Sequence, residues 1–414
     1  MTSAADLTTG RATALYVGAL LGPSVLLLPG LAASLAGPAS ILAWSGLLVV
    51  SGLLAWIFSS LGTRLPGRGG VAAYTAAAFG PRAERAVTWC FLGGVSCGAP
   101  VVCLIGAAYV SRLLGGGHLA TVLVATVLLV AVVALTLGGA RASSTAQLVL
   151  VAVLIALIAL AVVGSAPQAK AANWHPFAPH GWTGVGHASS VLMLSFVGWE
   201  AIAPLTARLH DPRRQLPRVI TAAFVITSAV YLSLSVATIA VLGRNAGSPV
   251  PVADLLHLAL GRAGGVIAAA AAIALTLAAT NAYLTGAAEM VAGLRGQKRA
   301  SERAAGSRRL QLGVAAAGVV LLGAAGAGLV TTAELVALPT AMFLTVYVGC
   351  TAAAARVLTG PVRSAAVLAC AAVLLVLAFS GWAPLLALAV VAAAVGTRAR
   401  PAGYREPAAI SGLP

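Results

Sequence analysis

Apolar runs of about 20 residues recur along the whole chain, and they constrain its fold more than any other feature. A helix of that length crosses the ~30 Å hydrocarbon core of a bilayer. Hydrophobic residues make up 60% of the 414 residues and charged residues only 8%, which excludes a soluble globular domain. We therefore predict an all-α integral membrane protein with about twelve transmembrane helices. Their expected ranges are 11–36, 38–61, 84–113, 119–138, 144–165, 185–207, 219–243, 263–293, 311–330, 334–357, 362–380 and 382–397.

The segments between the apolar runs predict one short helix and several loops. Residues 62–81 are too polar to cross a bilayer, and their length is sufficient for a short interfacial helix. The segment that contains Asn245, Pro249, Pro251 and Asp254 is expected to be a loop between the seventh and eighth spans. The basic segments 208–218 and 295–309 are expected to be loops as well.

The positive charge of the chain indicates its orientation in a membrane rather than a nucleic-acid partner. The net charge is +16, but the basic residues lie mostly in short loops without interleaved aromatic residues. Cytoplasmic loops collect Lys and Arg. With twelve spans and both termini in the cytoplasm, 21 of the 25 Lys and Arg residues are cytoplasmic, and the other four are Arg112, Lys170, Arg244 and Arg262. We expect a multi-pass protein of the plasma (inner) membrane with a cytoplasmic tail at 398–414.

The first apolar run is interrupted in its middle. The stretch from Gly22 to Gly30 contains Pro23, Ser24 and Pro29. Proline lacks an N–H group and clashes with the preceding turn, so one continuous helix is not expected here. Backbone groups freed by such a break are tolerated in a membrane only where they are buried in protein or line a cavity. The alternative is that the glycines only allow close packing of helices.

The sixth run has a similar interruption together with an acidic residue. Glu200 is the only acidic residue deep inside a span, and Gly198 and Pro204 flank it. An ionisable group at this depth faces a cavity or a partner and is a candidate functional residue. The alternative is a protonated glutamic acid that only hydrogen-bonds to backbone within the break. Burial raises the pKa of a carboxyl group, so a proton site is compatible with both interpretations.

Interrupted helices at corresponding places in two halves are typical of inverted-repeat transporters with a substrate site at the membrane midplane. The free N–H groups at the start of one half-helix attract an anion. The free carbonyl groups at the end of the other accept hydrogen bonds from a cation. An amino acid zwitterion supplies one group of each kind, so the two breaks predict an amino acid site.

Four sequence motifs lie in order along the chain. They are Gly22-Pro23-Ser24-Val25 with Leu28-Pro29-Gly30, then Pro66…Gly69-Gly70…Tyr74…Phe79-Gly80…Trp89, then Phe196-Val197-Gly198-Trp199-Glu200, then Asp211-Pro212-Arg213-Arg214-Gln215-Leu216-Pro217-Arg218. Their residues and spacing resemble those of the amino acid–polyamine–organocation (APC) superfamily of permeases. The short chain and the stretches 69–72 and 139–144 are most similar to the small bacterial exporters of methionine and branched-chain amino acids.

This resemblance implies a fold and a set of site residues. The fold is a five-plus-five inverted repeat of the leucine-transporter type, with broken helices one and six and two additional C-terminal helices. The implied domain is 1–397, with a first repeat at about 11–165, a second at about 185–357 and the extra helices at about 362–397. The implied substrate-binding residues are Gly22, Pro23, Ser24 and Val25 for the carboxylate, Phe196, Val197 and Gly198 for the ammonium, and Trp199 as a wall or gate.

Other positions follow from the resemblance and from depth in the spans. Glu200 matches a family glutamate that is linked to proton coupling in some members. Depth alone suggests which residues line the side-chain pocket, namely Cys97, Gly98, Ala99 and Pro100 of the third span and Thr276, Thr280 and Asn281 of the eighth. One departure concerns Pro23, which stands where the family usually has serine and removes one N–H donor from the carboxylate site.

The residues point to a neutral substrate and away from catalysis. No second buried acid is available for a guanidinium or a polyamine, which favours an apolar amino acid of the methionine or branched-chain type. The loops contain no nucleophile–base pair, HExxH motif or P-loop, so no enzyme, cofactor or metal is expected. The five cysteines lie in apolar runs and are expected to be free.

The leading hypothesis is a secondary active exporter of neutral amino acids, working as an antiporter with H⁺ as the coupling ion. Two alternatives stay open at this point. An uptake permease of the same fold would have the same residues, because gradients and coupling set the direction of transport. A membrane sensor that does not transport would need a soluble partner on the tail or on 295–309, where nothing resembles a docking motif.

Overall fold

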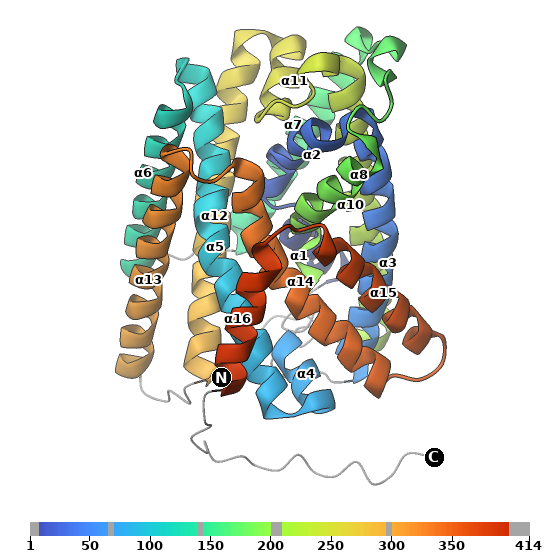
Figure 1. Cartoon of the computed structure of the whole chain (residues 1–414), viewed down its shortest axis with the longest axis vertical. Coiled ribbons are helices and arrows are strands. Elements are labelled where there is room, and N and C mark those ends of the chain that lie inside the picture. The colour runs from blue at the N-terminus through green and yellow to red at the C-terminus, as the bar shows by residue number, and fades with distance from the viewer. Residues whose placement is uncertain (1–7, 65–69, 140–143, 200–208, 295–299, 397–414) are drawn as a thin grey trace.

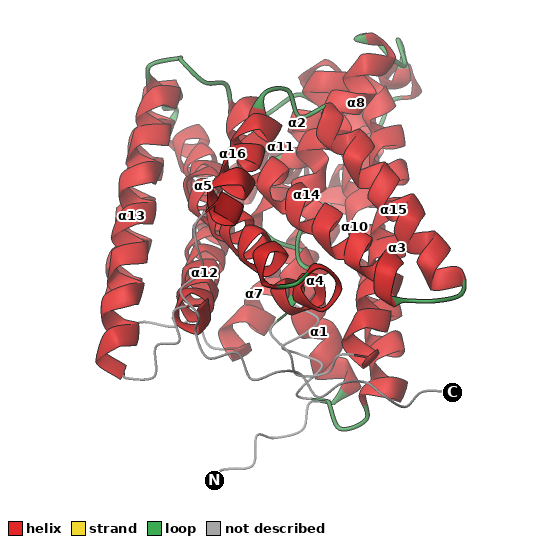
Figure 2. Ribbon diagram, turned by 60° about the horizontal axis from the view of Figure 1, so that its bottom comes forward, coloured by secondary structure: helices red, strands yellow, loops and turns green. Residues whose placement is uncertain are grey.

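The computed structural model describes residues 8–64, 70–139, 144–199, 209–294 and 300–396. These residues form helices connected by short turns, and no strand occurs among them (Figures 1 and 2). The α-helices are α1 (Thr9–Leu20), α2 (Leu28–Ala36), α3 (Ser40–Arg64), α4 (Val71–Phe79), α5 (Pro81–Leu114), α6 (His118–Leu137), α7 (Ser144–Ser165), α8 (Gly181–Leu192), α10 (Pro212–Leu242), α11 (Pro251–Leu260), α12 (Arg262–Leu294), α13 (Ala300–Gly326), α14 (Thr332–Val357), α15 (Pro361–Ala378) and α16 (Ala383–Gly396).

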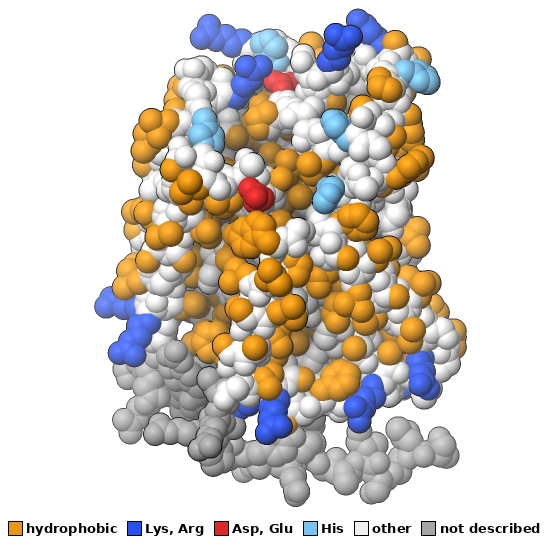
Figure 3. Space-filling view, viewed as in Figure 1, with side chains coloured by type: hydrophobic (Ala, Val, Ile, Leu, Met, Phe, Trp, Pro, Cys, Tyr) orange, Lys and Arg blue, Asp and Glu red, His pale blue; other side chains and the backbone are white. Residues whose placement is uncertain are grey.

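Nine helical runs in the described residues are long and apolar enough to cross a membrane. They coincide with predicted spans, and one of them contains both α2 and α3. The predicted spans one, six and twelve correspond to helices that are shorter than these runs. On the face drawn in Figure 3, hydrophobic side chains cover the middle of the molecule and Lys and Arg lie towards its two ends. The all-helical, multi-pass character is therefore confirmed, and the count of twelve stays a prediction.

The centre of the molecule is built around α5 and α14. In the most apolar window of each, 72% of the residues are buried inside the protein, whereas the corresponding share is 28% for α6, α7, α13 and α15. The latter helices expose leucine and valine side chains at their surfaces, as helices in contact with lipid do. The elements next to α5 and α14 are therefore the ones that can enclose a site.

The predicted interfacial helix is present as α4, between Gly70 (φ 69°) and Gly80 (φ 80°). Both glycines adopt positive φ angles that favour a residue without a side chain, and they set the two ends of the helix. The five cysteines are free, as expected.

Three predicted loops are partly helical. The segment between the seventh and eighth spans contains α11, which begins at Pro251, a residue suited to the first turn of a helix, and ends before Gly261 (φ 63°). The helix α10 begins at Pro212 because the Asp211 side chain accepts a hydrogen bond from the Arg214 N–H at 3.3 Å. The helix α13 begins at Ala300, within a stretch expected to be a loop because of its charge. The prediction of loops was therefore wrong at 251–260, 212–218 and 300–309.

Candidate functional site

The first predicted span is broken, as its prolines and glycines predict. The helix α1 ends at Leu20, Gly22 is extended (φ −81°, ψ 179°), and a single 3-10 turn spans Pro23–Leu26 before α2 begins. Pro23 cannot donate the hydrogen bond that would continue α1. Ser24, Val25 and Leu26 are buried, so the backbone groups that the break frees from helical hydrogen bonds lie inside the protein.

The sixth predicted span is broken at the same level. The helix α8 continues as a 3-10 turn to Phe196, Val197 is extended (ψ 127°), and Gly198 has a φ of 146°. A Cβ atom on Gly198 would lie 2.6 Å from the carbonyl oxygen of Ala19. Both the φ angle and this approach require glycine. The second break therefore packs directly on the end of α1.

Three buried tyrosines from three surrounding helices hold the backbone of the two breaks. The hydroxyl of Tyr231, on α10, lies 2.7 Å from the Leu20 carbonyl oxygen and 2.6 Å from the Ser195 carbonyl oxygen. It therefore connects both breaks. Such partners are needed because an unsatisfied carbonyl group is costly in a membrane interior.

The other two tyrosines each hold one break. The hydroxyl of Tyr347, on α14, donates to the Phe196 carbonyl at 3.1 Å and accepts the Gly198 N–H at 3.2 Å. The hydroxyl of Tyr109, on α5, donates to the Leu26 carbonyl at 2.8 Å. The Phe196 carbonyl, which was predicted to face an ammonium group, thus already accepts one hydrogen bond from the protein.

A small central cavity lies between the two breaks. Its volume is about 50 Å³, enough for a few water molecules. It is walled by the span-one break, by α5, by the span-six break, by α12 and by α14. The lining residues are Ala19, Leu20, Gly22, Pro23, Ser24, Gly94, Val95, Gly98, Ala99, Val102, Leu194, Val197, Thr280, Tyr283 and Phe343.

The chemistry of this lining is apolar with a few hydroxyl groups. None of the described residues that line it carries a charge, and the hydroxyls come from Ser24, Thr280 and Tyr283. The buried Thr280 hydroxyl has at most the weak neighbouring thiol of Cys103 as a partner. The Ser24 and Thr280 hydroxyls can bind a polar group of a ligand, and the remaining wall suits an apolar side chain.

A larger cavity adjoins the central one. It measures about 350 Å³ and lies along α1, α7 and α12. It shares Ala19, Gly22, Pro23 and Tyr283 with the central cavity, and Gly198 also lines it. Ligand pockets usually measure ~300–1,000 Å³, so this cavity, unlike the central one, has the size of a site for a small molecule.

The predicted site residues divide into those that reach these cavities and those that do not. Gly22, Pro23, Ser24 and Val197 line the central cavity, and Gly198 lines the adjoining one. Val25 and Phe196 are buried elsewhere, with Phe196 packed against the rings of Trp44 and Tyr231.

The remaining predicted residues do not reach these cavities or lie outside the described residues. The indole N–H of Trp199 donates to the Ser51 hydroxyl at 2.9 Å, so this ring packs on α3. The amide of Asn281 donates to the Thr136 hydroxyl on α6 at 3.0 Å, and Asn281 does not line either cavity. Cys97, Pro100 and Thr276, which were also chosen by depth, line neither cavity. Glu200, the predicted proton-coupling residue, lies outside the described residues.

Comparison with known proteins assigns the family. The family model described as "Amino acid permease" matches residues 7–299, which is more than half of the chain. The chain belongs to the amino acid permease family of the APC superfamily. The permease is 32% identical over 401 residues to YecA of Bacillus subtilis, named as an uncharacterised amino acid permease, with 93% of each chain covered.

Two relatives carry more specific names. The L-methionine/branched-chain amino acid exporter YjeH of Escherichia coli is 34% identical over 220 residues, about half of each chain (52%). The branched-chain amino acid permease BcaP of Lactococcus lactis is 24% identical over 276 residues, with 59% of this chain and 58% of BcaP covered. The family is one of transporters, so the central cavity together with the 350 Å³ cavity that adjoins it at Gly22 and Pro23 is the candidate substrate site of a permease.

Proposed function

We propose that this permease is a secondary active exporter of neutral apolar amino acids of the methionine and branched-chain type. The observation that carries the proposal is the central cavity with the 350 Å³ cavity that adjoins it, where two broken helices meet and where no described lining residue is charged. The Ser24 and Thr280 hydroxyls would bind the polar end of the substrate. The apolar wall made by Val95, Leu194 and Phe343 would contact its side chain. The similarity to YjeH supports the same substrate class.

An inverted repeat is supported by the places of two short helices. In the first half, α4 lies between the second and third predicted spans, and in the second half α11 lies between the seventh and eighth. Figure 1 shows these two helices at opposite ends of the molecule, as inverted halves require. We propose repeats at about 11–165 and 185–357, two additional helices at about 362–397, and a plasma-membrane location with cytoplasmic termini.

The transport cycle would alternate access around the two breaks. The 350 Å³ cavity adjoins the central cavity at Gly22 and Pro23 and runs along the half of span one that is formed by α1. In the proposed orientation α1 is the cytoplasmic half, so this cavity would be the cytoplasmic route to the site. Glu200 would couple export to H⁺ by exchanging a proton between the two states.

Flux into proteoliposomes tests this proposal. Purified permease is expected to exchange labelled methionine and leucine, and not labelled arginine, because no described carboxylate lines the cavity to pair with a guanidinium. Absence of methionine and leucine flux would contradict the substrate class. A pH gradient should change the rate, and Glu200→Gln should abolish this dependence, whereas the tail variant Glu406→Gln should retain it.

Uptake is a second candidate because BcaP, a relative, is named as a branched-chain amino acid permease. Export and uptake differ in the effect of deleting the gene in the native cell. Export predicts that intracellular methionine rises after deletion when methionine-containing peptides are supplied. Uptake predicts that growth on low external methionine slows instead.

A further inference from the structure

Two adjoining cavities lie beside α11, away from the site between the helix breaks. The larger measures about 900 Å³ and the smaller about 290 Å³, and both are lined by Arg112, Asp254 and His257. The larger one is also lined by Arg244, Asn245 and Ser248, and the smaller one by Arg262. We call the two cavities together the α11 vestibule.

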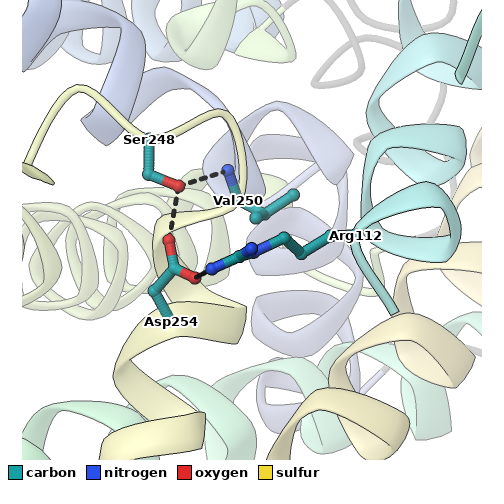
Figure 4. Close-up of polar contacts among 4 residues, drawn as sticks. All are labelled: Arg112, Ser248, Val250 and Asp254. Carbon is teal, nitrogen blue, oxygen red and sulfur yellow. Dashed lines mark hydrogen bonds and ion pairs between the residues drawn. The ribbon is translucent and has the colours of Figure 1, made fainter. Parts of the chain in front are cut away.

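Positive charge exceeds negative charge in the α11 vestibule. Three arginines face one carboxylate there, that of Asp254. Asp254 is already paired: one oxygen lies 3.3 Å from an Arg112 nitrogen, and the other accepts the Ser248 hydroxyl (Figure 4). Ser248 itself accepts the Val250 N–H at 3.1 Å, which fixes its direction. Among the described residues, neither Arg244 nor Arg262 has a carboxylate partner.

The location of this charge is unusual for a chain of this kind. In the predicted topology the extracytoplasmic loops contain only four Lys and Arg residues, which are Arg112, Lys170, Arg244 and Arg262. Loops on that side are normally poor in Lys and Arg. Three of these four line the α11 vestibule. The enrichment of Lys and Arg in cytoplasmic loops does not explain arginines on the extracytoplasmic side. Three arginines around one pair of cavities suit an anionic ligand.

We propose that the α11 vestibule binds an oxyanion, either a carboxylate or a lipid phosphate, at a site separate from the substrate site between the helix breaks. Arg112 makes one hydrogen bond to Asp254, and its side chain remains 68% exposed. A guanidinium has five N–H donors, so Arg112 can also bind a second carboxylate. Arg244 and Asn245 line the same cavity, and their side chains can supply further N–H donors.

Asp254 competes with the ligand for Arg112. A bound carboxylate and Asp254 would both be anions at the same guanidinium, and like charges at close range repel. Loss of the Asp254 charge should therefore strengthen anion binding, whereas loss of the Arg244 charge should weaken it. These opposite signs distinguish a binding site from general damage to the fold.

The experiment measures binding of isovalerate by titration calorimetry to the full-length permease in phosphatidylcholine nanodiscs. Isovalerate has a carboxylate and no ammonium group, so it is a poor ligand for a zwitterion site. Saturable binding is expected in the wild type, about tenfold weaker for Arg244→Gln and several-fold tighter for Asp254→Asn. The control Lys170→Gln removes a charge that lines neither cavity and should bind as the wild type does.

A lipid phosphate has the same oxyanion chemistry and is tested in parallel. Nanodiscs that contain phosphatidylglycerol should weaken isovalerate binding if the headgroup occupies the vestibule, and Arg244→Gln should remove this competition. Competition that depends on Arg244 would support the oxyanion site and identify a lipid as its natural occupant. If neither anion binds, or if binding is indifferent to Arg244→Gln and Asp254→Asn, the proposal is overturned, whatever the flux assay shows.

Discussion

The Tyr231 hydroxyl lies 2.7 Å from the carbonyl oxygen of Leu20, the last residue of α1. The same hydroxyl lies 2.6 Å from the Ser195 carbonyl in the break of the sixth predicted span. A phenol has one proton, so it donates to one of these carbonyls at a time. The two breaks, which lie more than 170 residues apart in sequence, are therefore held by a single side chain from α10.

Tyr231→Phe is expected to destabilise the permease and to weaken substrate binding. The change removes the one donor that two buried carbonyl groups share, and the loss is worth roughly 1–3 kcal/mol. We expect a lower Tm and a higher apparent KM for methionine, measured by thermal unfolding in detergent and by proteoliposome flux.

Tyr74→Phe is the matched control for this prediction. The Tyr74 side chain is also buried, but its hydroxyl has no hydrogen-bond partner among the described residues. Removing that hydroxyl should leave Tm unchanged or raise it slightly. Equal losses in the two variants would mean that the hydroxyl of Tyr231 does not hold the breaks.

The sequence predicted the two breaks because their causes are local. Pro23 removes a donor and Gly198 supplies an unusual φ angle, and both effects act within one turn of helix. The tyrosines that complete the breaks could not be predicted, because Tyr109, Tyr231 and Tyr347 come from three separate helices. A tyrosine in an apolar run is a weak signal, since it is equally compatible with an interfacial position.

Two other differences between the sequence-based predictions and the structure have physical explanations. The helix α11 was missed because Pro249, Pro251 and Asp254 resemble loop residues, yet Pro251 and Asp254 both suit the first turn of a helix. The proposed inverted repeat would itself have indicated a counterpart of α4 there. Asn281 was chosen by depth in its span, but depth does not define the direction of a side chain, and its amide is bonded to Thr136.

Gly198→Ala is expected to abolish transport and reduce the yield of folded protein. An added Cβ would lie 2.6 Å from the Ala19 carbonyl oxygen, and the φ of 146° is rarely adopted by residues with a side chain. We expect loss of methionine flux and a broad elution profile in size-exclusion chromatography. Gly313→Ala, a substitution in α13 with no atom within 4 Å of the added Cβ, should leave both measurements unchanged. Normal flux in Gly198→Ala would show that the two breaks do not need this close contact.

Gly98→Ala is expected to change the substrate preference of the permease without unfolding it. Gly98 lines the central cavity, and an added Cβ would lie 3.6 Å from Pro339, an ordinary contact distance. The methyl group would instead occupy part of a cavity of about 50 Å³. We expect flux of methionine and leucine to fall relative to that of alanine, measured in one competition assay. A uniform decrease for all three amino acids would argue against this wall as the side-chain contact.

Ser51→Ala tests the contact that holds the far side of the span-six break. The Trp199 indole N–H donates to the Ser51 hydroxyl at 2.9 Å, and both side chains are buried. Its removal leaves a buried donor without its acceptor, which costs about 1–3 kcal/mol, so Tm should fall. Ser40→Ala is the control on the same helix, because the Ser40 hydroxyl is buried without a hydrogen-bond partner among the described residues.

The Ser51→Ala substitution is also expected to alter the pH dependence of flux, because Trp199 directly precedes Glu200 in the chain. The control Ser40→Ala should leave this pH dependence as in the wild type. A fall in Tm with an unchanged pH profile would restrict the role of this contact to stability.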